Sequence, residues 1–182
     1  MKLFFDTEFT GLHKNTTLIS IGIVAEDGRQ FYAELNDYDR KQCTNWIEDN
    51  VITNLHYKKG CETYIENYYY GDSENVRVML KNWLSQFEHI QFVSDVCHYD
   101  FVLLIELLST MALWLPKNIS SVCHDINQDI AKYFGISETA AFDLSREKIL
   151  LESGVSLPMG EKHNALYDAK VIRDIYMLMN NG

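Results

Sequence analysis

Three short apolar stretches dominate the first 35 residues of the chain. Residues 2–5 lead directly into Asp6-Thr7-Glu8-Phe9, and residues 18–24 form a second, continuous apolar run. After a Glu26-Asp27-Gly28 turn, residues 30–35 alternate between apolar and polar side chains. Apolar runs bounded by turn residues are typical of strands, and an Asp-Gly turn commonly joins antiparallel neighbours. We therefore expect three adjacent antiparallel strands at the start of the chain.

The remaining residues alternate helical periodicity with short apolar runs. In residues 76–87 the apolar side chains recur mostly three and four positions apart on one helical face, and Ser73 can cap that helix. The pattern predicts helices over residues 39–55 (capped by Asp39), 73–87, 100–115, 126–134 (capped by Asp125), 144–152 and 164–179, and strands over residues 90–96 and 119–123. Residues 56–72 fit neither pattern, and the tyrosines of residues 64–70 favour a loop or irregular helix. This order predicts an α/β fold with a mixed central sheet flanked by helices.

Length, composition and charge limit the classes of protein that remain. A chain of 182 residues with 47% hydrophobic residues is typical of a single domain, here residues 1–182. No apolar run approaches the ~18 residues of a membrane span, and Asp6 interrupts what would be the apolar part of a secretory signal. We therefore expect a cytoplasmic protein without a membrane partner. A net charge of −10 excludes a basic coat for binding nucleic acid, but not a cleft in which divalent cations supply positive charge.

Asp6 and Glu8 are the first candidates for chemistry. Because they are two positions apart on a predicted strand, both side chains leave the same face. Adjacent carboxylates repel each other, and a shared cation removes that conflict. The alternative is a strand end that faces solvent.

Two further groups lie where predicted helices begin. Asp100 opens an apolar helix, where an acid also fits a simple cap, and His163 and Asp168 flank the start of the last helix. Five residues along a helix turn Asp168 by about 140° from His163, so the two would not share a face of one regular helix. If they act together, His163 must lie on the preceding loop or first turn. The alternative for His163 alone is a polar loop residue.

Taken together, these residues point to one kind of chemistry. Two divalent cations such as Mg²⁺ or Mn²⁺ need oxygen ligands, which Asp6, Glu8, Asp100 and Asp168 offer. A neutral imidazole nearby, that of His163, can accept the proton of an attacking water. This set fits two-metal hydrolysis of a phosphodiester.

Three segments also resemble the motifs of a known superfamily. Phe5-Asp6-Thr7-Glu8-Phe9-Thr10-Gly11-Leu12 resembles the first motif of the RNase H-like, DnaQ-type 3′–5′ exonucleases. Tyr99-Asp100 resembles the second motif, and His163-x-Ala165-x-x-Asp168 resembles the third in its histidine (DEDDh) variant. Ile19-Ser20-Ile21-Gly22 and, more weakly, residues 46–51 are similar to the small bacterial and phage 3′–5′ exoribonucleases. The resemblance implies an RNase H-like fold.

The resemblance also implies roles for individual residues. It makes Asp6 the bridge between both metals, Glu8 and Asp168 ligands of the metal that activates water, Asp100 a ligand of the second metal, and His163 the general base. Phe9 and Leu12 would pack against the terminal nucleotide, and backbone near Thr10 would approach its sugar. Two positions depart from the pattern: Ser20 stands where many relatives have Glu, and Asp95 stands where many have Asn. For Asp95 we expect a structural role as a hydrogen-bond acceptor.

The expected function is hydrolysis of RNA from its 3′ end, on single strands or 3′ overhangs, with release of 5′-mononucleotides. Two alternatives stay open: a DNA 3′–5′ exonuclease of the same fold, and a nucleic-acid-binding module without catalysis. The long apolar helices and the aromatic residues of positions 64–70 also favour a homodimer.

Overall fold

The computed structural model describes residues 1–57, 66–109 and 115–180 of the chain. The strands are β1 (Lys2–Phe9), β2 (Leu18–Ala25), β3 (Gln30–Leu35), β4 (Tyr68–Gly71), β5 (Gln91–Ser94) and β6 (His124–Asp125). The α-helices are α1 (Asn45–Asn50), α2 (Ser73–Leu84), α3 (His98–Leu108), α4 (Ile126–Phe134), α5 (Glu138–Phe142), α6 (Arg146–Glu152) and α7 (Ala165–Asn180), with 3₁₀ turns η1 (Arg40–Gln42) and η2 (Ile52–Asn54). Within the described ranges, no helix has the length and apolarity that a membrane span requires.

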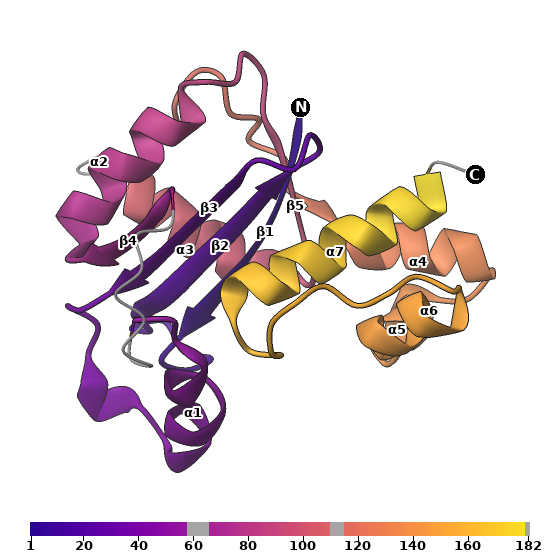
Figure 1. The fold of residues 1–182 in the computed structure, drawn as a ribbon, viewed down its shortest axis with the longest axis horizontal. Coiled ribbons are helices and arrows are strands. Elements are labelled where there is room, and N and C mark those ends of the chain that lie inside the picture. The colour runs from indigo at the N-terminus through magenta and orange to yellow at the C-terminus, as the bar shows by residue number, and fades with distance from the viewer. Residues whose placement is uncertain (58–65, 110–114, 181–182) are drawn as a thin grey trace.

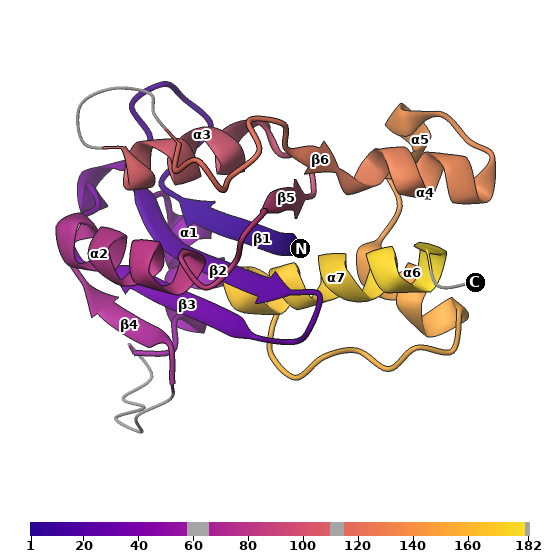
Figure 2. The ribbon, with the colours of Figure 1, turned by 90° about the horizontal axis from the view of Figure 1, so that it is seen from above.

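The strands form one mixed sheet in the order β4-β3-β2-β1-β5-β6 (Figure 1; β6 is labelled in Figure 2). The pairs β1–β2 and β2–β3 are antiparallel, whereas β3–β4, β1–β5 and β5–β6 are parallel. The three antiparallel strands expected at the start of the chain and the mixed sheet are therefore confirmed. Strand β1, which is as long as β2, lies inside the sheet and carries Asp6 and Glu8 toward its end.

Helices cover both faces of the sheet, and the alternation of side chains along β1 assigns its residues to them. Leu3 and Phe5 belong to the core beneath α2 and α3, whereas Phe4 belongs to the core beneath α4, α6 and α7. Figure 2 shows α3 and α7 on opposite sides of the strands. Because strand side chains alternate with a period of two, Asp6 and Glu8 share the face of Phe4, which is the α7 face.

The N-terminal end of α7 packs unusually close to β2. A Cβ atom at Gly22, which pairs with Asp6 in the sheet, would lie 2.3 Å from the backbone nitrogen of Leu166. Only a residue without a side chain permits this approach. Gly22 therefore sets how near the start of α7, and with it Asp168, can come to the strands.

Capping side chains explain where several helices begin, and they correct two predictions. Asp125 caps α4 as expected, accepting a hydrogen bond from the backbone N–H of Asn127. Helix α2 is capped by Asp72 rather than Ser73. A continuous helix over residues 39–55 was wrong: Asp39 caps only η1, and Thr44 caps the separate helix α1.

The shortest elements account for the remaining differences from the prediction. In the 64–70 segment, Tyr68, Tyr69 and Tyr70 form the edge strand β4 instead of a loop, and Tyr64 lies outside the described residues. The strand expected at 119–123 is reduced to one bridge between Ile119 and Ile90, and β6 follows it. A continuous helix over residues 100–115 was wrong: α3 starts two residues before Asp100 and ends at Leu108, because the backbone of Ser109 is extended. Helix α5 has no counterpart in the prediction.

Candidate active site

A cavity of about 830 Å³ opens where β1 ends and α7 begins. All eight site residues named from the sequence line it: Asp6, Glu8, Phe9, Thr10, Leu12, Asp100, His163 and Asp168. Residues from both ends of the chain thus meet in one place.

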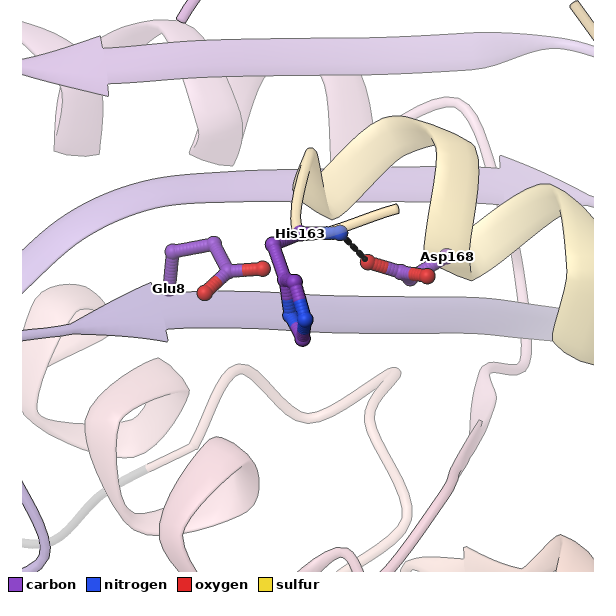
Figure 3. Close-up of side chains that lie close together, drawn as sticks. All are labelled: Glu8, His163 and Asp168. Atoms are coloured by element: carbon purple, nitrogen blue, oxygen red, sulfur yellow. Dashed lines mark hydrogen bonds between the residues drawn. The ribbon is translucent and has the colours of Figure 1, made fainter. Parts of the chain in front are cut away.

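Three of these residues are close enough to share one ion. One ligand atom from each of Glu8, His163 and Asp168 lies within 4.8 Å of the others, the one such group among the residues that the structure describes. Figure 3 shows Glu8 rising from β1, His163 on the loop just before α7, and Asp168 in the first turn of that helix. The His163 ring thus lies directly beside the carboxylates of Glu8 and Asp168.

His163 lies on the loop before α7, as the spacing to Asp168 requires. Its backbone N–H donates to Oδ2 of Asp168 at 2.8 Å, and its backbone has a φ of 64°, a left-handed conformation that is uncommon for residues other than glycine. The ring of Trp46 contacts the imidazole edge to face, with 5.0 Å between the ring centroids. Burial, assisted by the charge of Lys162, lowers the pKa of His163 below its usual 6.5, so the neutral imidazole predominates near pH 7.

Asp100 reaches the cavity from the first turn of α3. Its Oδ1 accepts hydrogen bonds from the backbone N–H of Thr7 at 3.0 Å and from the Thr7 hydroxyl at 2.5 Å. Burial raises the pKa of Asp100 to about 6, although the bonds from Thr7 oppose the rise. These bonds tie the carboxylate to β1, beside Asp6 and Glu8, so Asp100 does more than cap its helix.

The other carboxylates are also held in conditions that disfavour their charged form. Burial, followed by repulsion from Asp100, Asp168 and Glu8, raises the pKa of Asp6 well above its usual value. Burial raises the pKa of Asp168 to about 7, and it raises that of Glu8 with added repulsion from Asp168. A cluster of carboxylates that repel each other in a partly dehydrated cavity is relieved by divalent cations, and its all-oxygen ligands match the preference of Mg²⁺ and Mn²⁺. The residues present therefore fit the implied metals.

Asp95, which departs from the family pattern, has a structural role. Arg146 binds both of its oxygens, Nε to Oδ2 at 2.7 Å and Nη2 to Oδ1 at 2.9 Å, and Asn127 donates to Oδ1 at 2.8 Å. The expected role as a hydrogen-bond acceptor is thus confirmed. The sequence did not single out Arg146, which joins the segment after β5 to α4 and α6, because nothing in its neighbourhood marks it as the partner of Asp95.

Aromatic and apolar side chains form the wall of the cavity next to the acids. Phe9 stacks on Tyr99 with centroids 5.6 Å apart, and Leu12 is 76% exposed. The Thr10 hydroxyl is buried and donates a hydrogen bond to Gln42 Oε1 at 2.6 Å, so this side chain joins the segment after β1 to η1. Trp46 also lines the cavity and is 54% exposed. The sequence did not identify Trp46 as a site residue, because its spacing fitted the apolar face of a predicted helix.

A family described as the 3′–5′ exoribonuclease Rv2179c-like domain matches residues 1–178. The chain belongs to this family. A curated relative, the 3′–5′ exoribonuclease Rv2179c of Mycobacterium tuberculosis (strain ATCC 25618 / H37Rv), is 28% identical over 130 residues, which cover 70% of this chain and 73% of the relative. The family and this relative are both named for 3′–5′ exoribonuclease activity. The enzyme class expected from the sequence is therefore confirmed.

Solved structures show that the Rv2179c-like chain has the fold of RNase H-like nucleases. Cell-death related nuclease 4 (CRN-4) aligns with a TM-score of 0.64 at 15% identity, over 99% of this chain and 63% of its own. A 3′-exonuclease that recognises the histone mRNA stem-loop gives 0.62 at 12% identity, over 98% of this chain and 63% of its own. The RNase domain of yeast Pop2 gives 0.59 at 11% identity, over 97% and 77%. This chain therefore spans less than two thirds of the first two structures.

Proposed function

We propose that this chain is a metal-dependent 3′–5′ exoribonuclease that removes 5′-mononucleotides from single-stranded or overhanging 3′ ends of RNA. The observation that carries the proposal is the convergence of Asp6, Glu8, Asp100, Asp168 and His163 in one cavity. A module that only binds nucleic acid has no need for this complete set. The active unit is one domain over residues 1–182.

The four carboxylates would hold two divalent ions, Mg²⁺ or Mn²⁺. Asp6 lies in the interior strand and is repelled by Asp100, Asp168 and Glu8, which suits a ligand shared by both ions. Glu8 and Asp168 would hold one ion, and Asp100, oriented by Thr7, would serve the other. When bound, the ions polarise the scissile phosphate and lower the pKa of the attacking water.

His163 is the general base. Its pKa lies below 6.5, so at neutral pH an unprotonated ring nitrogen is available to accept a proton from the attacking water. The imidazole is only partly buried, which lets it reach the water. General-base catalysis of this kind contributes about 10²- to 10⁴-fold in rate.

The apolar wall receives the 3′-terminal nucleotide. Phe9 and Leu12 contact its base and sugar, and the backbone at Thr10 approaches the ribose, where a 2′-hydroxyl distinguishes RNA from DNA. Trp46 offers an exposed ring on the same cavity for stacking.

A cytoplasmic location accords with the free thiols of Cys43, Cys97 and Cys123 among the described residues.

Matched oligonucleotides test direction and substrate. With Mn²⁺ present, RNA with a free 3′-hydroxyl should shorten from that end, a 3′-phosphate should stop the reaction, and a blocked 5′ end should not. Degradation of circular RNA would contradict an exonuclease, and faster hydrolysis of DNA than of RNA would favour the DNA alternative. No loss of any substrate would favour the binding module.

A further inference from the structure

One buried acid lies outside the metal-binding cluster. Glu34 in β3 is 1% exposed and pairs in the sheet with Ser20, which in turn pairs with Glu8. Glu34 therefore lies two strands from Glu8 in the same cross-strand row, about 10 Å away at the usual strand spacing. It is too far along the row to share the ligand group of Glu8, His163 and Asp168.

The Glu34 carboxylate fixes the hydroxyl of Tyr32. The Tyr32 hydroxyl donates to Glu34 Oε1 at 2.8 Å, and the same oxygen accepts the backbone N–H of His56 at 2.5 Å. Because its own proton is given to Glu34, the Tyr32 oxygen presents a lone pair to other donors. Asn164 Nδ2 uses it, at 3.2 Å.

The Asn164 amide is held at both ends. Its Oδ1 accepts the backbone N–H groups of Leu166 at 3.2 Å and Tyr167 at 3.3 Å, which caps the start of α7. Its Nδ2 donates to the Tyr32 hydroxyl and also to the backbone carbonyl of Asn54 at 3.0 Å. The amide cannot turn without losing one of these pairs.

The residue on the other side of His163 is anchored too. The Lys162 carbonyl accepts a hydrogen bond from Asn54 Nδ2 at 2.9 Å. His163 thus lies between two anchored residues, in the left-handed backbone conformation that a residue with a Cβ adopts only when its surroundings hold it there.

We propose that Glu34, Tyr32 and Asn164 form a hydrogen-bonded positioning chain that places the His163 ring at the metal cluster. The role as general base that this ring serves rests on the function proposed above. None of the three residues lines the cavity, so this positioning chain acts through the backbone that carries His163.

Two conservative substitutions break the chain at different links. Tyr32→Phe removes the hydroxyl and keeps the ring, while Asn164→Asp keeps the acceptor that caps α7 and removes the donor to Tyr32 and Asn54. Each should lower kcat by about 10- to 100-fold, with KM and the Mn²⁺-induced rise in melting temperature unchanged. Tyr68→Phe is the matched control, because the Tyr68 ring packs on Tyr32 with centroids 5.3 Å apart but gives the chain no hydrogen bond. It should keep wild-type turnover.

The His163→Ala background separates positioning from general damage. If the chain acts only through His163, adding Tyr32→Phe to His163→Ala should cause no further loss of residual turnover. A multiplied loss would overturn the proposal.

A measurement on the ring itself does not depend on turnover. The imidazole proton resonances of His163, identified by their absence in His163→Ala, lie within the ring-current field of Trp46. They should shift in Tyr32→Phe and Asn164→Asp and stay in place in Tyr68→Phe. Unchanged resonances in both variants would overturn the positioning chain even in an active enzyme. Shifted resonances in a protein that does not hydrolyse RNA would leave the chain standing and remove the proposed function.

Discussion

His163 and Asp168 are hydrogen-bonded to each other, yet their replacement should have different consequences. A general base can be removed without removing the metals, whereas a ligand cannot. His163→Ala should therefore keep the metal-induced rise in melting temperature and lose turnover by about 10²- to 10⁴-fold. Asp168→Ala should lose both. Melting curves with and without Mn²⁺, beside turnover of a single-stranded RNA, measure the two effects.

The pH profile gives the control for this assignment. Wild-type activity should rise with pH as the imidazole loses its proton, with a midpoint below 6.5 because burial lowers the pKa of His163. In His163→Ala this limb should vanish. Near-normal turnover of His163→Ala with the same limb would show that another group is the base.

The carboxylates predict how the metal-free protein responds to pH. Folding raises the pKa of Asp168 to about 7 and that of Asp100 to about 6, above the usual value of 3.8. A group whose folded pKa is raised contributes stability below its unfolded pKa and loses that contribution as pH rises through the folded value. In EDTA, the melting temperature should therefore fall between pH 5 and pH 8, and Asp168→Asn should flatten the fall.

Bound cations replace the protons, so saturating Mn²⁺ at pH 8 should restore the melting temperature that EDTA lowers. A metal-free protein that melts at the same temperature at pH 5 and pH 8 would contradict the repulsion inferred for this cluster.

At the scale of elements, the contact between α7 and β2 depends on one glycine. A methyl group at Gly22 would meet the backbone of Ala165 and Leu166 at 2.3–2.4 Å, and backbone has no rotamer to yield. Gly22→Ala should lower the free energy of unfolding by about 3 kcal/mol and reduce turnover, because α7 carries Asp168. Denaturant unfolding measures the first effect and RNA hydrolysis the second.

Gly71→Ala provides the matched control, since its added Cβ would meet only Asn75 Cβ at an ordinary 3.5 Å. It should change the free energy of unfolding far less. Equal effects of the two substitutions would contradict the close approach of α7 to the sheet as the cause.

Long elements and ordered motifs were predictable from the sequence, whereas short elements were not. The apolar runs of β1 to β3 and the periodicity of α4 and α7 extend over several residues, which is enough to define a period. Four residues such as Tyr68–Gly71 define none, and their strand state depends on pairing with β3 across a stretch of the chain. Likewise Asp39 and Thr44 are both good caps, and only packing decides which of them begins a helix.

The candidate site divides in the same way. The acids and His163 stand in recognisable local patterns, so they could be named from the sequence. Other residues contact partners that are distant in sequence, and no local pattern predicts such contacts. They are Trp46, Arg146 and the members of the positioning chain, Glu34, Tyr32 and Asn164. Register, which places Glu34 in the row of Glu8, becomes visible only in the folded sheet.

At the scale of the whole molecule, several apolar side chains in α4, in α5 and in the turn between them are exposed. Tyr133, Phe134, Ile136 and Phe142 are each between 37% and 57% exposed. Burying these side chains against a second copy would remove apolar surface from water, and we expect a homodimer. Sedimentation at micromolar concentration should give about twice the 21.2 kDa of one chain, and Phe134→Glu should lower it. A wild-type mass near that of one chain would contradict the dimer.

The central claim, that the acidic cluster is a divalent metal site, is tested most directly by melting wild type and Asp6→Ala with and without Mn²⁺. Asp6 is buried and is repelled by the carboxylates around it, so its removal should raise the melting temperature of the metal-free protein. Mn²⁺ at 100 times its dissociation constant should stabilise wild type by about 2.7 kcal/mol and leave Asp6→Ala almost unchanged. Equal stabilisation of the two proteins by Mn²⁺ would contradict a metal site built on Asp6.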